Sequence, residues 1–260
     1  MTPSAHRFPA HGLLPADTTE EVRARRPQWA LLPIGSFEQH GPFLPLTTDT
    51  VIACTLAEQI AAAHPVHLLP PLTLSCSHEH AAWPGTVSIS ARTLHAVVTD
   101  IADSLRRSGI HTLILVNGHG GNYVLRNVVQ ESAGTGMRMA LFPGSADWDA
   151  ARRRAGAETS THSDMHAGEV ETSILLHAHP DLVRPGYEST ESEESAESAD
   201  WIADERKHLL TLGMSAYTES GIIGRPSLAS ARKGQELLAG LVEAFGEYAA
   251  LFGTRTESHG

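Results

Sequence analysis

The sequence predicts an α/β protein with a mostly parallel central sheet and helices on both faces of that sheet. Short apolar runs alternate with helical patterns along most of the chain, and this alternation is typical of parallel sheets. The most apolar run, HTLILVNG at residues 111–118, is continuous rather than alternating, as expected for a central strand that is covered on both faces. Since 260 residues are enough to bury a full core, we expect a single domain that spans residues 1–260.

The elements follow in order from local signals. The first helix begins near Thr18, because Asp17 or Thr18 can cap it and two glutamates follow in its first turn. Apolar runs predict strands at residues 29–35, 66–72, 111–118 and 137–144. Helical periodicity predicts helices at residues 49–63, 91–109, 121–134, 168–178 and 234–252.

Two segments stand apart from this alternation. Residues 1–16 are rich in proline and alanine, and we expect them to be loosely attached. Residues 187–205 contain eight acidic residues and repeated serines. Such a composition buries little apolar surface, so it predicts a solvated loop.

The charge balance excludes several classes of partner. The chain has 19 Lys and Arg against 30 Asp and Glu, a net charge of −11, so it lacks the positive field that nucleic acids and anionic membranes attract. No apolar run approaches the ~18 residues of a membrane span, and no apolar segment of a secretory signal is present. Two cysteines are too few for a disulfide framework. We therefore expect a cytoplasmic protein that binds neither nucleic acid nor membrane.

Three polar clusters follow predicted strands, at the edge of the sheet where parallel α/β proteins bind ligands. In the first, GSFEQHGPFLPLTTD, the residues Glu38, His40 and Asp49 lie within twelve positions. Two carboxylates and an imidazole make a ligand set for a divalent metal such as Zn²⁺, Mn²⁺ or Fe²⁺. The alternative is that Asp49 only caps the following helix and that His40 is a satisfied turn residue.

The second cluster, VNGHGGN, ends the central strand. Its glycines permit a tight turn and the close approach of a ligand, so we expect His119 to bind a metal. The backbone N–H groups of Gly120 and Gly121 can then face the substrate. A dinucleotide-binding turn would need glycine at the position of Tyr123 and makes no use of a histidine.

The third cluster, SDMHAGEVETS, leads into a predicted helix. In a helix over residues 168–178, Glu171 falls inside the apolar arc, whereas Glu169 lies well outside it. A carboxylate on a buried face must be paired or metal-bound, because burying it bare costs several kcal/mol. Glu171 is therefore the predicted ligand, and Glu169 is the alternative. His166 precedes the helix and is free to transfer protons.

A fourth segment, SCSHEHAAWPGT, carries His78, Glu79 and His80 before an apolar turn. We expect a substrate-contacting loop, with His80 and Trp83 lining the pocket; a second metal site and a plain surface loop are the alternatives. The chain has neither the G-x-S-x-G elbow of serine hydrolases nor a phosphate-binding P-loop. A metal site is the chemistry that remains.

The chain resembles the creatininase (creatinine amidohydrolase) family in four stretches with the same order and spacing: PIGSFEQHGPFLPLTTDT, SHEHAAWPGT, VNGHGGN and HAGEVETS. The resemblance covers about residues 29–185. It implies a three-layer α/β/α fold, assembly as a homohexamer, and a site with two metal ions. It also implies hydrolysis of non-peptide or small cyclic C–N bonds.

By this resemblance, four residues match the family's metal ligands: Glu38, His40, Asp49 and His119. Asp49 matches the residue that bridges both ions, and His166 matches the catalytic histidine. Creatininase itself carries a tyrosine and a glutamate after the histidine of the third motif, and the glutamate is a ligand. This chain has Gly120 and Gly121 there, so the missing carboxylate must come from elsewhere, and the helical pattern nominates Glu171. The glycine form looks more like the branches that process other amides, among them formamide deformylases and the mycofactocin maturation peptidase.

The sequence therefore predicts a metal-dependent amidohydrolase that uses a metal-activated water to cleave a non-peptide or cyclic C–N amide bond of a small molecule. We expect two divalent ions per chain, with Zn²⁺ first and Mn²⁺ or Fe²⁺ as alternatives. Two other functions stay open: a peptidase-like maturation enzyme for a modified peptide of the mycofactocin type, and a non-catalytic metal-binding scaffold on the same fold.

Overall fold

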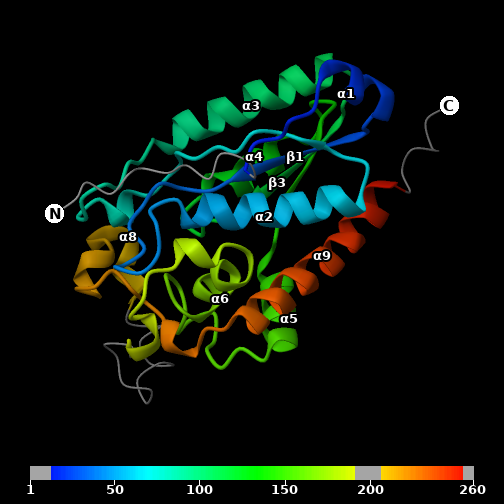
Figure 1. Ribbon diagram of the computed structural model, residues 1–260. Coiled ribbons are helices and arrows are strands. Elements are labelled where there is room, and N and C mark those ends of the chain that lie inside the picture. Colours follow the sequence, from blue (N-terminus) through cyan, green and yellow to red (C-terminus); the bar gives the residue numbers. More distant parts are fainter. Residues whose placement is uncertain (1–12, 191–205, 254–260) are drawn as a thin grey trace, which may run out of the picture.

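A four-stranded sheet lies at the centre of the computed structural model, which describes residues 13–190 and 206–253 (Figure 1). The strands run in the order β2-β1-β3-β4, and every neighbouring pair is parallel. They are β1 (Trp29–Ile34), β2 (His67–Leu68), β3 (Thr112–Asn117) and β4 (Arg138–Phe142). All residues of β3 except the last are buried, so the prediction of a central, doubly covered strand is confirmed.

Helices cover both faces of this sheet, which confirms the three-layer α/β/α class. The α-helices are α1 (Thr19–Arg25), α2 (Thr48–Ala63), α3 (Ala91–Arg107), α4 (Val124–Glu131), α5 (Ser145–Ala155), α6 (Glu169–Ala178), α8 (Leu209–Leu212) and α9 (Ala231–Gly253). Short 3₁₀ helices are η1 (His78–His80), η2 (Pro180–Leu182), η3 (Tyr187–Ser189), η5 (Arg206–His208), η6 (Met214–Ala216) and η7 (Pro226–Leu228). None of the helices in the described ranges is long and apolar enough to cross a membrane.

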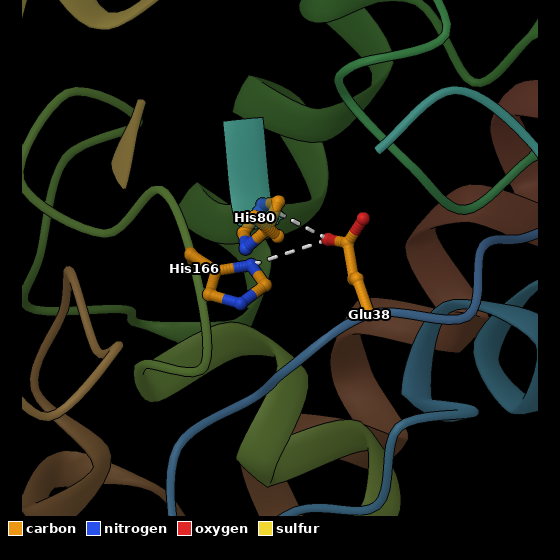
Figure 2. Close-up of side chains that lie close together, drawn as sticks. All are labelled: Glu38, His80 and His166. Carbon is orange, nitrogen blue, oxygen red and sulfur yellow. Dashed lines mark ion pairs between the residues drawn. The ribbon is translucent and has the colours of Figure 1, made fainter. Parts of the chain in front are cut away.

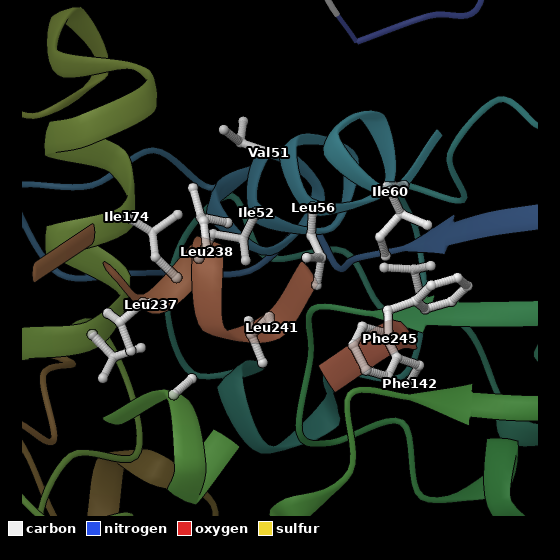
Figure 3. Close-up of a cluster of buried hydrophobic side chains, with 14 of the residues drawn as sticks. Val51, Ile52, Leu56, Ile60, Phe142, Ile174, Leu237, Leu238, Leu241 and Phe245 are labelled. Carbon is white, nitrogen blue, oxygen red and sulfur yellow. The ribbon is translucent and has the colours of Figure 1, made fainter. Parts of the chain in front are cut away.

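The two faces of the sheet carry separate cores because successive residues of a strand point to opposite sides. Leu113 and Leu115 of β3 belong to the core under α3 and α4. Ile114 and Val116 belong to the larger core, to which α2, α5, α6 and α9 contribute (Figure 3). Phe245 of α9 is fully buried there, so the long C-terminal helix is part of the main core.

Most predicted elements are present with shifted ends. The helix α1 is capped by Thr18 rather than Asp17: the Thr18 hydroxyl accepts from Glu21 N, and the Glu21 carboxylate accepts from Thr18 N at 2.6 Å. The strand predicted at residues 66–72 is limited to β2 and one isolated bridge between Ile34 and Leu72. Two prolines between these pairings have no N–H to donate, which ends the ladder.

Two helices differ from the prediction. The helix α4 begins at Val124, three residues later than predicted, because Gly121 and Asn122 form a turn after β3. The helix α5 was not predicted at all. Its buried residues are only two alanines and one arginine, so it lacks the apolar stripe on which the sequence analysis relied. Of the acidic segment 187–205, only residues 187–190 lie inside the described ranges, and residues 1–12 lie outside them.

Candidate metal centre

The predicted site residues converge at the carboxyl ends of β1 and β3, and two glycines make this possible. A Cβ on Gly35 would lie 2.3 Å from the backbone nitrogen of Thr50, and one on Gly118 would lie 2.3 Å from the backbone oxygen of Asp49. No side chain fits at either position, so the first turn of α2 rests directly on the ends of two strands. This contact fixes Asp49 beside the loops that follow β1 and β3.

Asp49 is fully buried and its carboxylate is shared among three groups. Its Oδ2 accepts from Ser36 Oγ at 2.7 Å and lies 3.1 Å from His119 Nδ1, while its Oδ1 lies 3.0 Å from His40 Nε2. The helix α2 has Thr47 as N-cap, with no side-chain capping bond. The alternative in which Asp49 only caps the helix is therefore wrong.

His40 and His119 each turn one ring nitrogen toward this carboxylate. The Nδ1–H of His40 donates to Glu38 O at 3.1 Å, and the Nε2–H of His119 donates to Cys76 O at 2.8 Å. Backbone carbonyls thus fix the tautomer of both rings and leave the other nitrogen to face the centre. Burial opposes protonation of His40, but the Asp49 carboxylate outweighs it and raises the pKa of His40 to about 9.

Glu38 supplies the strongest sign that a cation belongs here. Its carboxylate is completely buried, and neither oxygen accepts a hydrogen bond from the residues that the structure describes. Its Oε1 lies 3.2 Å from both His119 Nδ1 and His80 Nε2, and 3.7 Å from His166 Nδ1 (Figure 2). A buried carboxylate that accepts no hydrogen bond is costly, and a divalent ion would satisfy it. The donor set of carboxylates and imidazoles therefore fits a divalent metal.

The hydrogen bonds of Gln39 place the ring protons of His80 and His166 differently. The backbone oxygen of Gln39 accepts from His166 Nε2 at 2.6 Å, which leaves Nδ1 of His166 as a free lone pair. The side-chain amide is oriented by Gly41 N and Gly221 O, so its NH₂ donates to His80 Nδ1 at 3.0 Å. The remaining nitrogen of His80 then carries a proton. His80 lies within ligand distance of Glu38 and His166, but this pattern favours a donor over a metal ligand.

The His166 ring lies between those of His40 and His80, at centroid distances of 4.2 and 4.4 Å. Burial and the charge of His40 hold the pKa of His166 well below its ordinary value. A neutral ring with an open Nδ1 can accept a proton or bind a metal, and His166 is close enough to Glu38 and Glu171 for either.

The two glutamates of α6 have different surroundings, since Glu171 faces the metal centre and Glu169 does not. The Glu171 carboxylate accepts from Ala167 N at 2.6 Å and reaches within 3.8 Å of His40 Nε2. Burial raises the pKa of Glu171 to about 7. Glu169 points elsewhere, to Thr159 and Lys233, and only 1% of it is exposed. The expectation that Glu169 lies away from the buried face was wrong.

That error has a physical cause. The helix α6 is buried on most of its circumference, including polar positions at Thr172 and Ser173. An apolar arc identifies the inner face only when the opposite face meets solvent. Here α9 and α2 also cover α6, so Glu169 is buried although it lies outside the apolar arc.

A cavity of about 360 Å³ opens beside the centre. Its wall includes His119, Gly120, His166 and Glu171 of the site, together with the aromatic residues Tyr123 and Trp148. Other predicted substrate contacts, namely Gly121, His80 and Trp83, do not line this cavity in the described structure. The Trp83 ring instead lies 6.4 Å from that of His80. Sequence reasoning missed Trp148 because it missed α5, the helix that carries it.

Comparison with known proteins adds an independent observation. A family model described as creatininase, creatinine amidohydrolase, matches residues 16–249. A mycofactocin precursor peptide peptidase of Mycobacterium ulcerans (strain Agy99) is 34% identical over 254 residues, which cover 94% of this chain and 93% of that protein. A creatinine amidohydrolase of Pseudomonas putida is 27% identical over 172 residues, 59% of this chain and 65% of that protein. A crystal structure of creatinine amidohydrolase (creatininase) shares the fold, with a TM-score of 0.69, 22% identity, and coverage of 90% and 95%.

Proposed function

Because this chain belongs to the creatininase family, we propose that it is a metal-dependent hydrolase that cleaves an amide C–N bond. The observation that carries the proposal is the buried Glu38 carboxylate, which no described hydrogen bond satisfies. It lies 3.2 Å from His119 Nδ1 and within ligand distance of His40 and Asp49, so its surroundings are those of a metal ligand.

Two sets of donors meet at Asp49, and we assign one divalent ion to each. Glu38 Oε1 and Asp49 Oδ2 both lie close to His119 Nδ1, whereas Asp49 Oδ1 and the Glu171 carboxylate both lie close to His40 Nε2. Zn²⁺ is our first choice for these mixed nitrogen and oxygen donors, with Mn²⁺ or Fe²⁺ as alternatives. Bound ions would supply Lewis acidity for a carbonyl oxygen and would acidify a water.

Residues of the chain itself would transfer the proton that the leaving nitrogen needs. An amine leaves poorly as an anion, so the departing nitrogen must receive a proton. His166 can take one at Nδ1 and deliver it, since its Nε2–H is held by the backbone oxygen of Gln39. The backbone N–H of Gly120, which lines the cavity, is a donor that can stabilise negative charge on the carbonyl oxygen.

Metal content and metal removal test this proposal. Elemental analysis of protein purified without chelator is expected to find about two divalent ions per chain. This protein is expected to hydrolyse an amide. Removal of the ions should abolish the activity, and adding them back should restore it. The substrate panel contains short peptides, lactams and N-formyl compounds. Hydrolysis that persists after both ions are removed, or an absence of bound metal after reconstitution, would overturn the proposal.

We favour a peptide as substrate because the relative that is 34% identical is named a precursor peptide peptidase. A small-molecule amide is the second candidate. It is favoured by the size of the cavity, about 360 Å³, which lies near the lower end of the range of small-molecule pockets. The ratio of kcat/KM for a peptide to that for a lactam or N-formyl compound decides between them.

Replacing His166 by glutamine is expected to lower kcat about 10²–10⁴-fold, the usual contribution of a proton-transfer group. Both metal ions are expected to stay bound, because the two donor sets above do not include His166. The measurements are kcat on a hydrolysed amide and elemental analysis of the same sample. His78→Gln is the matched control, since His78 is exposed and bonds to Ser88. Loss of a metal ion from His166→Gln would show that His166 is a ligand instead.

A further inference from the structure

We infer that Glu79 is a positioning residue: its carboxylate holds His119 in the orientation that binds metal, from the space that a side chain at position 121 would fill. The inference rests on the metal centre proposed above and extends it beyond the residues that face the ions. Glu79 belongs to η1, and neither of the two donor sets above includes it.

The fit between Glu79 and Gly121 is the first observation. A Cβ on Gly121 would lie 2.1 Å from Glu79 Oε1 and 2.4 Å from His119 Nε2. Both distances are far too short for non-bonded atoms, so the carboxylate and the imidazole together occupy the place of a side chain at 121. Only glycine leaves room for both. The neighbouring Gly120 has no such restriction, since a Cβ there would meet nothing within 4 Å.

The second observation is the direction in which the His119 ring faces. Its Nδ1 lies 3.2 Å from Glu38 Oε1 and 3.1 Å from Asp49 Oδ2. Its Nε2 faces away from the centre, to Cys76 O at 2.8 Å and Glu79 Oε1 at 3.5 Å. Glu79 therefore stands behind the ring, on the side opposite the proposed ions, and does not itself reach them.

A carboxylate in this place has a defined chemical effect. The Cys76 carbonyl is enough to keep the proton on Nε2, but it carries no net charge. A negative charge behind the ring makes the imidazole more basic and its lone pair a stronger donor to metal. The side chain of Glu79 is 13% exposed, so solvent screens this charge only partly. Among described residues, His119 is the only ion-pair partner of Glu79.

The test is the affinity of the protein for Zn²⁺, measured by competition with a chromophoric chelator. Glu79→Gln keeps the size of the side chain but removes its charge, so a role in packing alone would leave the affinity unchanged. We expect a 10–100-fold weaker affinity for one of the two ions, because His40 and Glu171 are untouched. Glu79→Asp, which keeps the charge but withdraws it from the ring, is expected to fall between wild type and Glu79→Gln. Glu131→Gln is the matched control, because it removes a carboxylate from the exposed Glu131–His95 pair and should bind Zn²⁺ as wild type does.

The outcomes separate the two proposals. If wild type binds no Zn²⁺, the proposed function fails. If wild type binds two ions and both Glu79→Gln and Glu79→Asp bind them with unchanged affinity, only the inference about Glu79 is overturned. The thermal unfolding of each variant without metal shows that it is folded. If Glu79→Gln does not fold, Glu79→Asp decides the question.

Discussion

Replacing Asp49 by asparagine is expected to abolish amide hydrolysis, with kcat/KM lowered on the order of 10⁴-fold, as when a residue central to a catalytic group is lost. Asp49 is the one carboxylate that meets both donor sets, through Oδ1 toward His40 and Oδ2 toward His119. The asparagine side chain fills the same space as aspartate but has only one oxygen and no negative charge. Both ions are therefore expected to bind weakly, although the shape of the site is kept.

Elemental analysis and kcat/KM on the same preparation check this expectation. The matched control is Asp103→Asn, a half-exposed aspartate of α3 that pairs with Arg106 on the surface, and it should behave as wild type. Surface pairs of this kind contribute little to stability. Retention of two ions and of hydrolysis in folded Asp49→Asn would contradict the assignment of Asp49 as the shared ligand.

The second large effect concerns stability. Replacing Lys233 by methionine is expected to cost about 3–5 kcal/mol, because removing one partner of a buried ion pair leaves the other charge uncompensated. Lys233 is 7% exposed, and its ammonium donates to Glu169, to Glu158 at 2.9 Å and to the backbone oxygen of Leu228 at 2.9 Å. Glu169 is the more buried carboxylate and would be the one left without its cation.

Urea unfolding at neutral pH measures this cost. The double variant Lys233→Met/Glu169→Gln should be more stable than the sum of the two single effects predicts, since no buried charge is then left unpaired. Glu169→Gln alone should retain both metal ions, whereas Glu171→Gln should lose one. If Glu169→Gln lost an ion and kept full stability, the roles of the two glutamates would have to be exchanged.

The contrast between these glutamates marks the limit of sequence reasoning. Residues near one another in the chain were placed well: Glu38, His40 and Asp49 meet because one strand, one loop and one helix start bring them together. The surroundings of Glu169 depend on Lys233, which is 64 positions away. A helical wheel contains no information about such a partner.

The protonated nitrogen of His80 could not be predicted either, because it also depends on a residue far away in the sequence. Its proton is assigned by the Gln39 amide, and that amide is oriented by Gly221, which is 182 positions from Gln39. The helix α5 was missed on other grounds, because it buries almost no apolar side chain. The fold class needed only the order of strong strands and helices, and that order is local information.

The contacts of Gln39 with His80 and His166 determine which of the two rings can accept a proton. Two rings of the same chemistry lie side by side, yet one residue makes them unlike: through its backbone it leaves His166 open to receive a proton, and through its side chain it leaves His80 with a proton to offer. The pair is therefore asymmetric: the open nitrogen belongs to His166, which lines the cavity, and the proton-bearing nitrogen belongs to His80, which does not. Only one of the two rings is thus placed to accept a proton at the cavity wall.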